Sequence, residues 1–297
     1  MLPRIHDARA WTAATIDDRA AWYYPLTDAC KAAFEEFRRH PPTFMLPEKT
    51  RAAIAESLQP VRRALEQGRG FAIIEAPNLS APDATLLCWI VGQGLGRPFA
   101  QNVQGTMLYD VRDTGASLAE GARFSVTSYE SSFHTDNSFG ADVLDYVGLL
   151  CLQVAKSGGR SQVLSGYAVH NQLAAEPDVL ATLYRAFHVE HRGGEGKAVQ
   201  VPIFQASGDE LLVRYLRYWI EAGHAKVGEP LTAAQVRALD ALDACLNRPD
   251  LRVEFDLKPG DMYFINNRWT LHNRTAFEDH AEPERRRHLV RLWLQKP

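Results

Sequence analysis

The tripeptide His134-Thr135-Asp136 constrains the fold and the chemistry of this sequence more than any other segment. Side chains two residues apart lie on the same side of an extended chain, so the imidazole of His134 and the carboxylate of Asp136 would point toward one position. A histidine beside an Asx residue is also common in surface turns, so the tripeptide alone leaves both interpretations open. The decision depends on whether a third polar group reaches the same position.

A third group of the required type, His272, lies near the other end of the sequence, in the segment 261–275. Two imidazoles and one carboxylate form the ligand set of mononuclear non-haem Fe(II) sites, where three protein groups occupy one face of the metal and leave the other face open. We therefore take His134, Asp136 and His272 as candidate metal ligands and catalytic residues. The same residue types also bind zinc in hydrolases, which need a general base beside the metal.

The charge balance disfavours several classes of partner. The 297 residues include 33 Lys and Arg against 36 Asp and Glu, and a net charge of −3 gives no electrostatic reason to bind nucleic acid or an anionic membrane surface. The N-terminus lacks the apolar region of a signal peptide, and the longest apolar stretch, 146–155, is too short to span a bilayer. The sequence predicts a soluble cytoplasmic protein that acts on a small molecule, with a homo-oligomer as an open possibility.

Helical patterns dominate the first 70 residues. Thr27 can cap a helix that ends at the Pro41-Pro42 pair, and Pro60 is expected to kink a second helical stretch. Four cysteines are scattered without a CxxC spacing, which implies no disulfide framework. The periodicity predicts helices at 28–40, 47–67, 84–91, 169–187 and 232–246.

Strand patterns dominate from about residue 105 onward, after a first short strand at 71–76. Further strands are expected at 146–152, 160–165, 251–258, 262–265 and 287–294. Strands interrupted by helical inserts, without regular βαβ alternation, favour an α+β, mainly β fold of jelly-roll type, a double-stranded β-helix packed against helices. One domain is expected over 1–297, with a mainly helical part at 1–70 and the jelly-roll core with its inserts at 71–297.

Three glycines, Gly92, Gly94 and Gly96, follow a predicted helix and not a strand. A dinucleotide-binding loop would follow a strand, so this reading is rejected. The three glycines indicate a helix stop and a turn.

Several motifs together resemble the taurine/α-ketoglutarate dioxygenase (TauD/TfdA, clavaminate synthase-like) family of Fe(II)/2-oxoglutarate-dependent oxygenases. These motifs are His134-Thr135-Asp136, Gly158-Gly159-Arg160-Ser161, the run from Gly260-Asp261 through Asn267 to His272, and Arg287-His288-Leu289-Val290-Arg291-Leu292-Trp293-Leu294. These motifs span about residues 70 to 295 and occur in the same order as in the family. The helical N-terminal part says less about family membership.

The resemblance implies a role for each matching residue. It implies that His134, Asp136 and His272 hold the iron and that Arg287 binds the distal carboxylate of 2-oxoglutarate, the cosubstrate used together with O₂. Ser161 stands where the family often has a threonine, a small departure that retains the hydroxyl. A guanidinium fork suits a carboxylate better than an ammonium group does.

An independent geometric argument concerns the two arginines near the C-terminus. If 287–294 is a strand, Arg287, Leu289, Arg291 and Trp293 share one face, while His288, Val290, Leu292 and Leu294 share the apolar face. The two arginines would then lie roughly 13 Å apart along one wall of the barrel. Arg291 would lie nearer the iron, available to a substrate anion or to the proximal carboxylate of the cosubstrate.

Substrate contacts are predicted from segments that can close over the pocket. The segment 111–122, rich in Gly and Asp, is a candidate lid. Glu130 and Arg291 near the iron would suit a zwitterion such as an amino acid or its derivative. The candidate substrate residues are Tyr109, Tyr129, Glu130, Asn137, Arg217 and Arg291.

The resulting expectation is an Fe(II)/2-oxoglutarate-dependent dioxygenase that hydroxylates a small polar substrate with release of succinate and CO₂. The same cofactor chemistry giving desaturation or cyclisation stays open, as does a non-catalytic metal-binding protein on the same fold. A halogenase is disfavoured because that chemistry replaces the carboxylate ligand with a small residue, and Asp136 is present.

Overall fold

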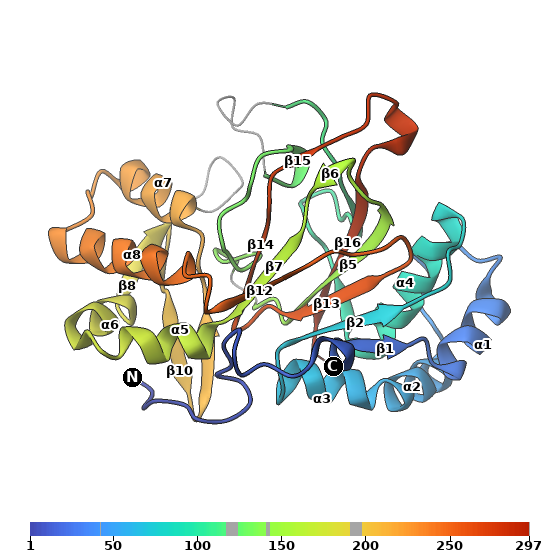
Figure 1. The fold of residues 1–297 in the computed structure, drawn as a ribbon, viewed down its shortest axis with the longest axis horizontal. Coiled ribbons are helices and arrows are strands. Elements are labelled where there is room, and N and C mark those ends of the chain that lie inside the picture. The colour runs from blue at the N-terminus through green and yellow to red at the C-terminus, as the bar shows by residue number, and fades with distance from the viewer. Residues whose placement is uncertain (42, 117–123, 141–142, 191–197, 297) are drawn as a thin grey trace.

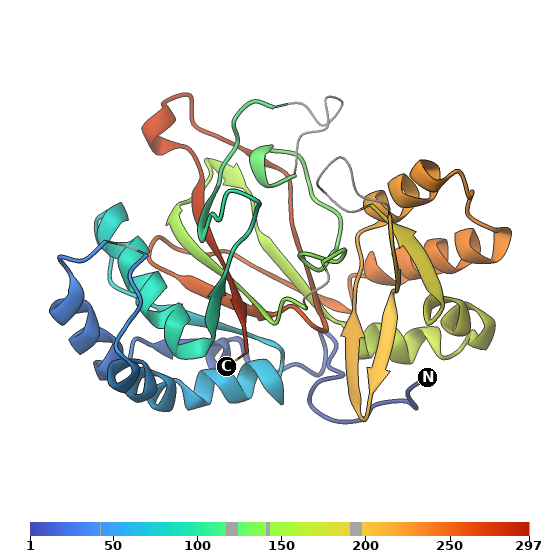
Figure 2. The ribbon, with the colours of Figure 1, turned by 180° about the vertical axis from the view of Figure 1, so that it is seen from behind.

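A computed structural model describes residues 1–41, 43–116, 124–140, 143–190 and 198–296 of the protein. The described chain has a mixed α/β architecture in which two sheets occupy the centre (Figure 1). Helices from the two halves of the sequence flank the sheets on opposite sides, as the view from behind also shows (Figure 2).

The large sheet is mixed, because β1 runs parallel to β2 while the remaining strand pairs are antiparallel. Its strand order is β1-β2-β13-β5-β16-β3, and β4 also pairs with β16. The strands are β1 (Tyr23–Pro25), β2 (Phe71–Glu75), β3 (Arg97–Phe99), β4 (Leu108–Val111), β5 (Tyr146–Gln153), β13 (Met262–Asn266) and β16 (His288–Gln295).

The small sheet is antiparallel, with the order β12-β7-β14. Its strands are β12 (Arg252–Phe255), β7 (Ser161–Ser165) and β14 (Thr270–Arg274). Side chains from both sheets, including Phe71 and Tyr263 from the large sheet and Val163 and Phe255 from the small one, form one buried cluster. The inner faces of the two sheets therefore meet in a shared apolar core.

Short antiparallel pairs complete the strands. They are β15 (Phe277–Glu278) with β6 (Ser157–Gly158), β8 (Ala186–Val189) with β9 (Val199–Pro202), and β10 (Phe204–Ser207) with β11 (Glu210–Val213).

Four helices from the N-terminal part cover the outer face of the large sheet. Val290, Leu292 and Leu294 of β16 pack into this cluster, which confirms the apolar face predicted for that strand. His288, at the end of the same strand, instead contacts the exposed Asp110 at 2.7 Å. The helices are α1 (Asp28–Phe37), α2 (Glu48–Ser57), α3 (Gln59–Glu66) and α4 (Ala81–Leu95).

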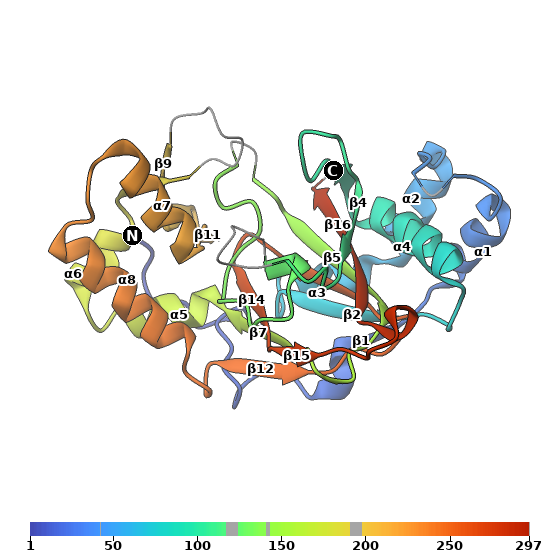
Figure 3. The ribbon, with the colours of Figure 1, turned by 90° about the horizontal axis from the view of Figure 1, so that it is seen from above.

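A second helical group lies on the opposite side of the strands, as the view from above shows (Figure 3). It packs around Leu164 of β7 and Leu271 of β14. Its helices are α5 (Gly166–Leu173), α6 (Pro177–Leu183), α7 (Arg217–Val227) and α8 (Ala233–Leu246). Short 3₁₀ helices occur at η1 (Arg19–Trp22), η3 (Phe124–Val126) and η4 (Pro283–Arg285).

Several predicted helices have different limits in the structure. The first ends at Phe37 and not at residue 40, although Thr27 caps it as expected, accepting a hydrogen bond from the Cys30 amide. The stretch 47–67 is two helices, and Pro60 lies in the first turn of the second, where a missing N–H removes no helical bond. The insert 169–187 is also two helices, and its last residues belong to β8.

The prediction of a helix stop and a turn was wrong for Gly92 and Gly94. Gly92 and Gly94 lie inside α4, and only Gly96 follows its end. A Cβ atom on Gly92 would come within 2.3 Å of Leu292 Cδ2, and one on Gly94 within 2.3 Å of Ile54 Cγ2. A side chain at either position would clash with these neighbours. The two glycines therefore allow α4 to pack closely against β16 and α2.

Two further findings concern the cysteines and the lengths of the helices. All four cysteines are free and buried. No helix in the described ranges is both long and apolar enough to cross a membrane.

Candidate metal centre

Backbone pairing brings the two candidate histidines together. His134 and His272 form an isolated antiparallel bridge, in which the amide of each donates to the carbonyl of the other at 3.1 and 3.0 Å. Their ring centroids lie 4.4 Å apart. The main chain therefore fixes the relative position of two imidazoles that are far apart in the sequence.

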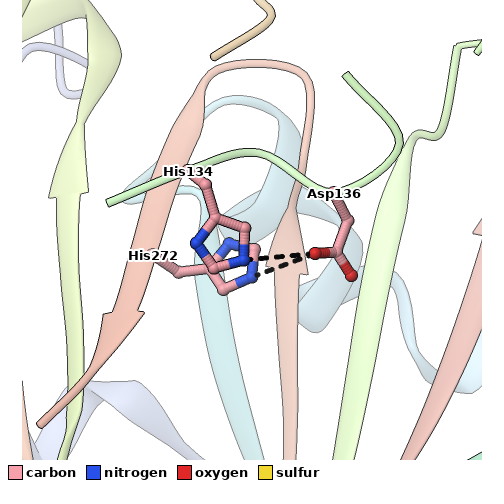
Figure 4. Close-up of side chains that lie close together, drawn as sticks. All are labelled: His134, Asp136 and His272. Carbon is pink, nitrogen blue, oxygen red and sulfur yellow. Dashed lines mark ion pairs between the residues drawn. The ribbon is translucent and has the colours of Figure 1, made fainter. Parts of the chain in front are cut away.

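The carboxylate of Asp136 completes a compact cluster (Figure 4). Its Oδ1 lies 3.3 Å from Nε2 of His134 and 3.8 Å from Nε2 of His272. One potential ligand atom from each residue falls within 4.8 Å of the other two. Ligands about 2.1 Å from a common metal are about 3 to 4 Å apart, so these positions fit a single ion.

The protonation states suit metal binding. Burial opposes ionisation of Asp136, but Arg291 and the two histidines outweigh it and hold the pKa of this carboxyl far below its ordinary value. Burial lowers the pKa of His272 to about 3, with a further contribution from His134. A neutral imidazole and an ionised carboxylate are the forms that ligate a metal.

Hydrogen bonds orient the candidate ligands. Nδ1 of His134 lies 2.8 Å from the Ser132 carbonyl, an arrangement that leaves Nε2 free to face the metal position. The side chain of Asn267 binds the main chain of Asp136 at two atoms: its Oδ1 accepts from the amide at 2.7 Å, and its Nδ2 donates to the carbonyl at 2.9 Å. Both contacts restrict the directions in which the ligands can point.

Arg291 lies beside the cluster, as the strand geometry predicted. Its Nη1 donates to Oδ2 of Asp136 at 3.0 Å and its Nε to Oε1 of Gln101 at 2.8 Å. The guanidinium lies over the ring of Trp293 at 4.9 Å and over that of Tyr109 at 5.2 Å. In this structure Arg291 therefore helps to hold the carboxylate of Asp136 in place.

Arg287 immediately precedes β16 and is buried, with an exposed fraction of 5%. Its Nη1 has no hydrogen-bond partner in the described ranges, and its guanidinium lies 5.2 Å over the ring of Phe277. Burial lowers the pKa of Arg287 to about 10. A buried guanidinium with an unused donor is a position at which an anion would be stabilised.

Ser161 occupies the start of β7, opposite Arg274 of β14 in register, and is buried. The next pair on the same face joins Val163 to His272. Since residues two apart on a strand share a face, the Ser161 hydroxyl and the His272 imidazole lie on one side of the small sheet.

The candidate substrate residues differ in their proximity to the cluster. Tyr109 stacks on Arg291. Oε1 of the exposed Glu130 lies 3.5 Å from the side-chain nitrogen Nδ2 of Asn273, which faces the opposite side of β14 from His272. Tyr129 is 58% exposed. Asn137, the residue after Asp136, has a positive φ of 54° and is half-buried.

Arg217 has partners of its own. It begins α7, and its guanidinium binds the carboxylates of Glu221, Asp240 and Asp243 at 2.7, 2.7 and 2.9 Å. These partners neutralise its charge within the helical layer. The predicted lid is described only up to residue 116, and 117–122 lie outside the described residues.

Three functional contacts were not foreseen from the sequence. Trp293 donates to Asp136, Asn267 holds the main chain of the same residue, and Arg274 lies beside Arg287 over Phe277. The strand pattern places Arg291 and Trp293 on one face, and this was a signal that could have predicted the contact between Trp293 and Asp136. The other two join segments whose proximity depends on the folded chain.

Comparisons with known proteins extend these observations. The chain is 29% identical to FR-33289 synthase of Streptomyces rubellomurinus over 96% of this chain and 88% of that protein. It is 25% identical to a uridine-5'-phosphate dioxygenase of an Amycolatopsis species over 77% of this chain and 86% of the relative.

A solved structure of asparagine oxygenase in complex with Fe(II), 2S,3S-3-hydroxyasparagine and succinate superposes with a TM-score of 0.68. The two chains are 20% identical over 92% of this chain and 93% of that one, which makes this a likeness of fold. The family model described as "Taurine catabolism dioxygenase TauD, TfdA family" matches residues 25–293. The chain therefore belongs to the TauD/TfdA dioxygenase family.

Proposed function

We propose that this protein is an Fe(II)/2-oxoglutarate-dependent dioxygenase that hydroxylates a small polar molecule. The observation that carries the proposal is the convergence of His134, Asp136 and His272 on one point, in a chain that belongs to a dioxygenase family. Two nitrogens and one carboxylate oxygen are the donor set that Fe(II) accepts, with one face left for other ligands.

The cosubstrate assignment rests on Arg287. Its buried Nη1 without a partner in the described part of the chain supports an anion at this position, and the distal carboxylate of 2-oxoglutarate has the required charge. Ser161 is proposed to add a hydroxyl donor. When bound, iron and 2-oxoglutarate would use O₂ to yield succinate and CO₂ while one oxygen atom enters a substrate C–H bond.

Other groups of the chain would orient the site and limit water. Arg291 and Trp293 hold Asp136, and apolar side chains such as Leu149 and Leu289 lie on the same inner wall. This wall supports exclusion of bulk water from the reacting position. A zinc hydrolase would have no use for Arg287, which favours the oxygenase.

The substrate is proposed to be a small polar molecule such as an amino acid or a derivative. The names of the relatives support this class without fixing one member, since they include an asparagine oxygenase and a uridine-5'-phosphate dioxygenase. Tyr109, whose ring lies against Arg291 beside the cluster, would contribute a polar contact. Hydroxylation is preferred to desaturation or cyclisation because the asparagine oxygenase structure contains a hydroxylated product.

We further propose that the two facing sheets form a double-stranded β-helix within one domain over 1–297. The shared core between the inner faces of the sheets supports this arrangement. The match of one family model to residues 25–293 supports a single unit. A cytoplasmic location stays a prediction.

The test of the function is anaerobic titration of the metal-free protein with Fe(II) and then 2-oxoglutarate, followed by visible absorption. A chelate of the two gives a weak metal-to-ligand charge-transfer band. We expect this band in the wild type, its loss in His134→Ala and a weaker band at equal 2-oxoglutarate in Arg287→Ala. Tight zinc binding with no such band would contradict the oxygenase assignment.

A further inference from the structure

Arg274, which is half-buried, and Arg287, which is buried, place two cations on one aromatic ring. Their guanidinium carbons lie 4.6 and 5.2 Å from the centroid of Phe277. Nε of Arg274 and Nη1 of Arg287 are both buried without a hydrogen-bond partner among the described residues. Since both groups lie over one ring, they are within about 10 Å of each other, where like charges repel appreciably.

The rest of Arg274 is bound to the segment that leads to the first candidate ligand. Its Nη1 donates to the Thr127 carbonyl at 3.0 Å, and its Nη2 donates to the Tyr129 carbonyl. Its own amide donates to the Ser131 hydroxyl at 3.1 Å, and its carbonyl accepts from the Ser131 amide at 3.2 Å. One arginine, two residues after His272, therefore fixes the segment 127–131 against β14.

We propose that Arg274 is a positioning residue that couples occupation of the cosubstrate pocket to the segment 127–131. The inference rests on the proposed function, in which a carboxylate binds Arg287. A carboxylate at Arg287 offsets the repulsion between the two guanidinium groups, so Arg274 holds the Thr127 and Tyr129 carbonyls more firmly when the pocket is filled. Binding of 2-oxoglutarate thereby stabilises the segment 127–131, which leads along the chain to His134.

Two features of the site favour this role over a purely structural one. A clamp that served only to hold two carbonyls would not need to stack on the ring that also supports Arg287. A neutral donor would hold the carbonyls without like-charge repulsion in a buried position. The arrangement instead makes the clamp sensitive to the charge that occupies the pocket.

The experiment measures binding and local protection without turnover, using protein loaded with Ni(II) in place of iron. Calorimetry gives the dissociation constant for 2-oxoglutarate, and hydrogen exchange gives the protection of amides 127–131 with and without it. In the wild type, 2-oxoglutarate slows exchange in this segment. In Arg274→Met, the dissociation constant rises by about 5- to 150-fold, and exchange in 127–131 no longer slows even when the pocket is saturated.

Arg274→Lys and Arg69→Met complete the comparison. Lysine keeps the charge but not the planar fork, so affinity falls less than in Arg274→Met while the protection of 127–131 is still reduced. Arg69 is a buried arginine whose guanidinium binds Asp17, the Ala21 carbonyl and Tyr24 away from the cluster. Arg69→Met therefore leaves the affinity for 2-oxoglutarate and the protection of 127–131 unchanged.

The outcomes separate the inference from the function on which it rests. A wild type that binds Ni(II) but not 2-oxoglutarate overturns both. If the wild type binds 2-oxoglutarate and Arg274→Met shows the same affinity and the same protection of amides 127–131, only the role of Arg274 is overturned. Unchanged affinity for Ni(II) in each variant shows that the fold around the metal ligands is intact, and Arg274→Lys supplies the test where the methionine variant does not fold.

Discussion

The indole Nε1 of Trp293 donates a hydrogen bond of 2.8 Å to Oδ2 of Asp136. Arg291 donates to the same oxygen at 3.0 Å, whereas Oδ1 faces the two candidate histidines. The two oxygens of one carboxylate thus have different partners. Asp136 would bind a metal through Oδ1 alone, because Oδ2 is already engaged by two donors.

Replacement of Trp293 with Phe is expected to weaken metal binding while the aromatic packing is largely retained. Loss of the donor frees Asp136 to rotate, and removal of such orienting contacts typically reduces metal affinity by about 10- to 100-fold. Competition titration of the metal-free protein with Fe(II) or Co(II) measures the change. Trp11→Phe is the control, since its indole donates to the Arg69 carbonyl at 2.7 Å away from the cluster. Equal metal affinities in the two variants would show that Trp293 does not orient Asp136.

Arg287→Met is expected to abolish tight binding of 2-oxoglutarate and to leave metal binding intact. Removing one partner of a buried, hydrogen-bonded charge pair costs about 2 to 5 kcal/mol. Arg287→Lys should recover only part of this loss, because lysine restores the positive charge but its ammonium group cannot form two parallel hydrogen bonds to a carboxylate. The Michaelis constant for 2-oxoglutarate, measured by succinate release, reports the effect.

Arg285→Met is the matched control for Arg287. Arg285 lies two residues earlier and is exposed, with its guanidinium 3.8 Å from Glu282. Its loss should leave the Michaelis constant within about twofold, since exposed ion pairs contribute little free energy. If Arg287→Met changed the Michaelis constant as little as Arg285→Met, the distal carboxylate of 2-oxoglutarate would have to bind at another residue.

Gly159→Ala is expected to impair cosubstrate binding through Arg287. Gly159 has a φ of +72°, and a Cβ atom there would lie 3.2 Å from Nε of Arg287 and 3.3 Å from Cβ of Phe277. The backbone strain costs about 1 to 2 kcal/mol of stability, and the contact displaces the guanidinium. Gly228→Ala has the same φ with no atom within 4 Å of the added carbon. Both variants should lose similar thermal stability, but only Gly159→Ala should raise the Michaelis constant for 2-oxoglutarate; a rise in both would mean that strain alone is responsible.

The candidate ligands could be predicted because the spacing of His134 and Asp136 is local and because His272 is a residue type that completes their ligand set. His134 and Asp136 lie two apart, and His272 follows a strand pattern that begins at Met262. The alternation along β16 likewise predicted that Arg291 would lie near the cluster while Val290 packs on the helices. A two-residue period in the sequence is sufficient for such statements.

Contacts that depend on tertiary proximity could not be predicted in this way. Asn267 belongs to the motif that leads to His272, yet its side chain binds the main chain of Asp136. The glycines in α4 looked like a helix end because glycine is a poor helix former, and only the neighbouring Leu292 and Ile54 explain them. In each case the deciding atoms belong to a residue more than 35 positions away in the sequence.

The last prediction concerns stability as a function of pH and the buried His170, which lies outside the candidate metal centre. Burial lowers the pKa of His170 to about 4, and its Nε2 lies 3.0 Å from the Tyr184 hydroxyl. Between pH 6.5 and pH 4 the unfolded chain binds a proton at this histidine that the folded chain excludes, so the free energy of unfolding falls as the pH is lowered. From pH 6.5 to pH 5 this one group should remove about 1 to 2 kcal/mol. Urea unfolding of the metal-free protein at both pH values should therefore show a smaller loss in His170→Gln than in the wild type, while a variant of the exposed His6 should show the wild-type loss. Equal losses in all three proteins would mean that His170 is already protonated in the folded state.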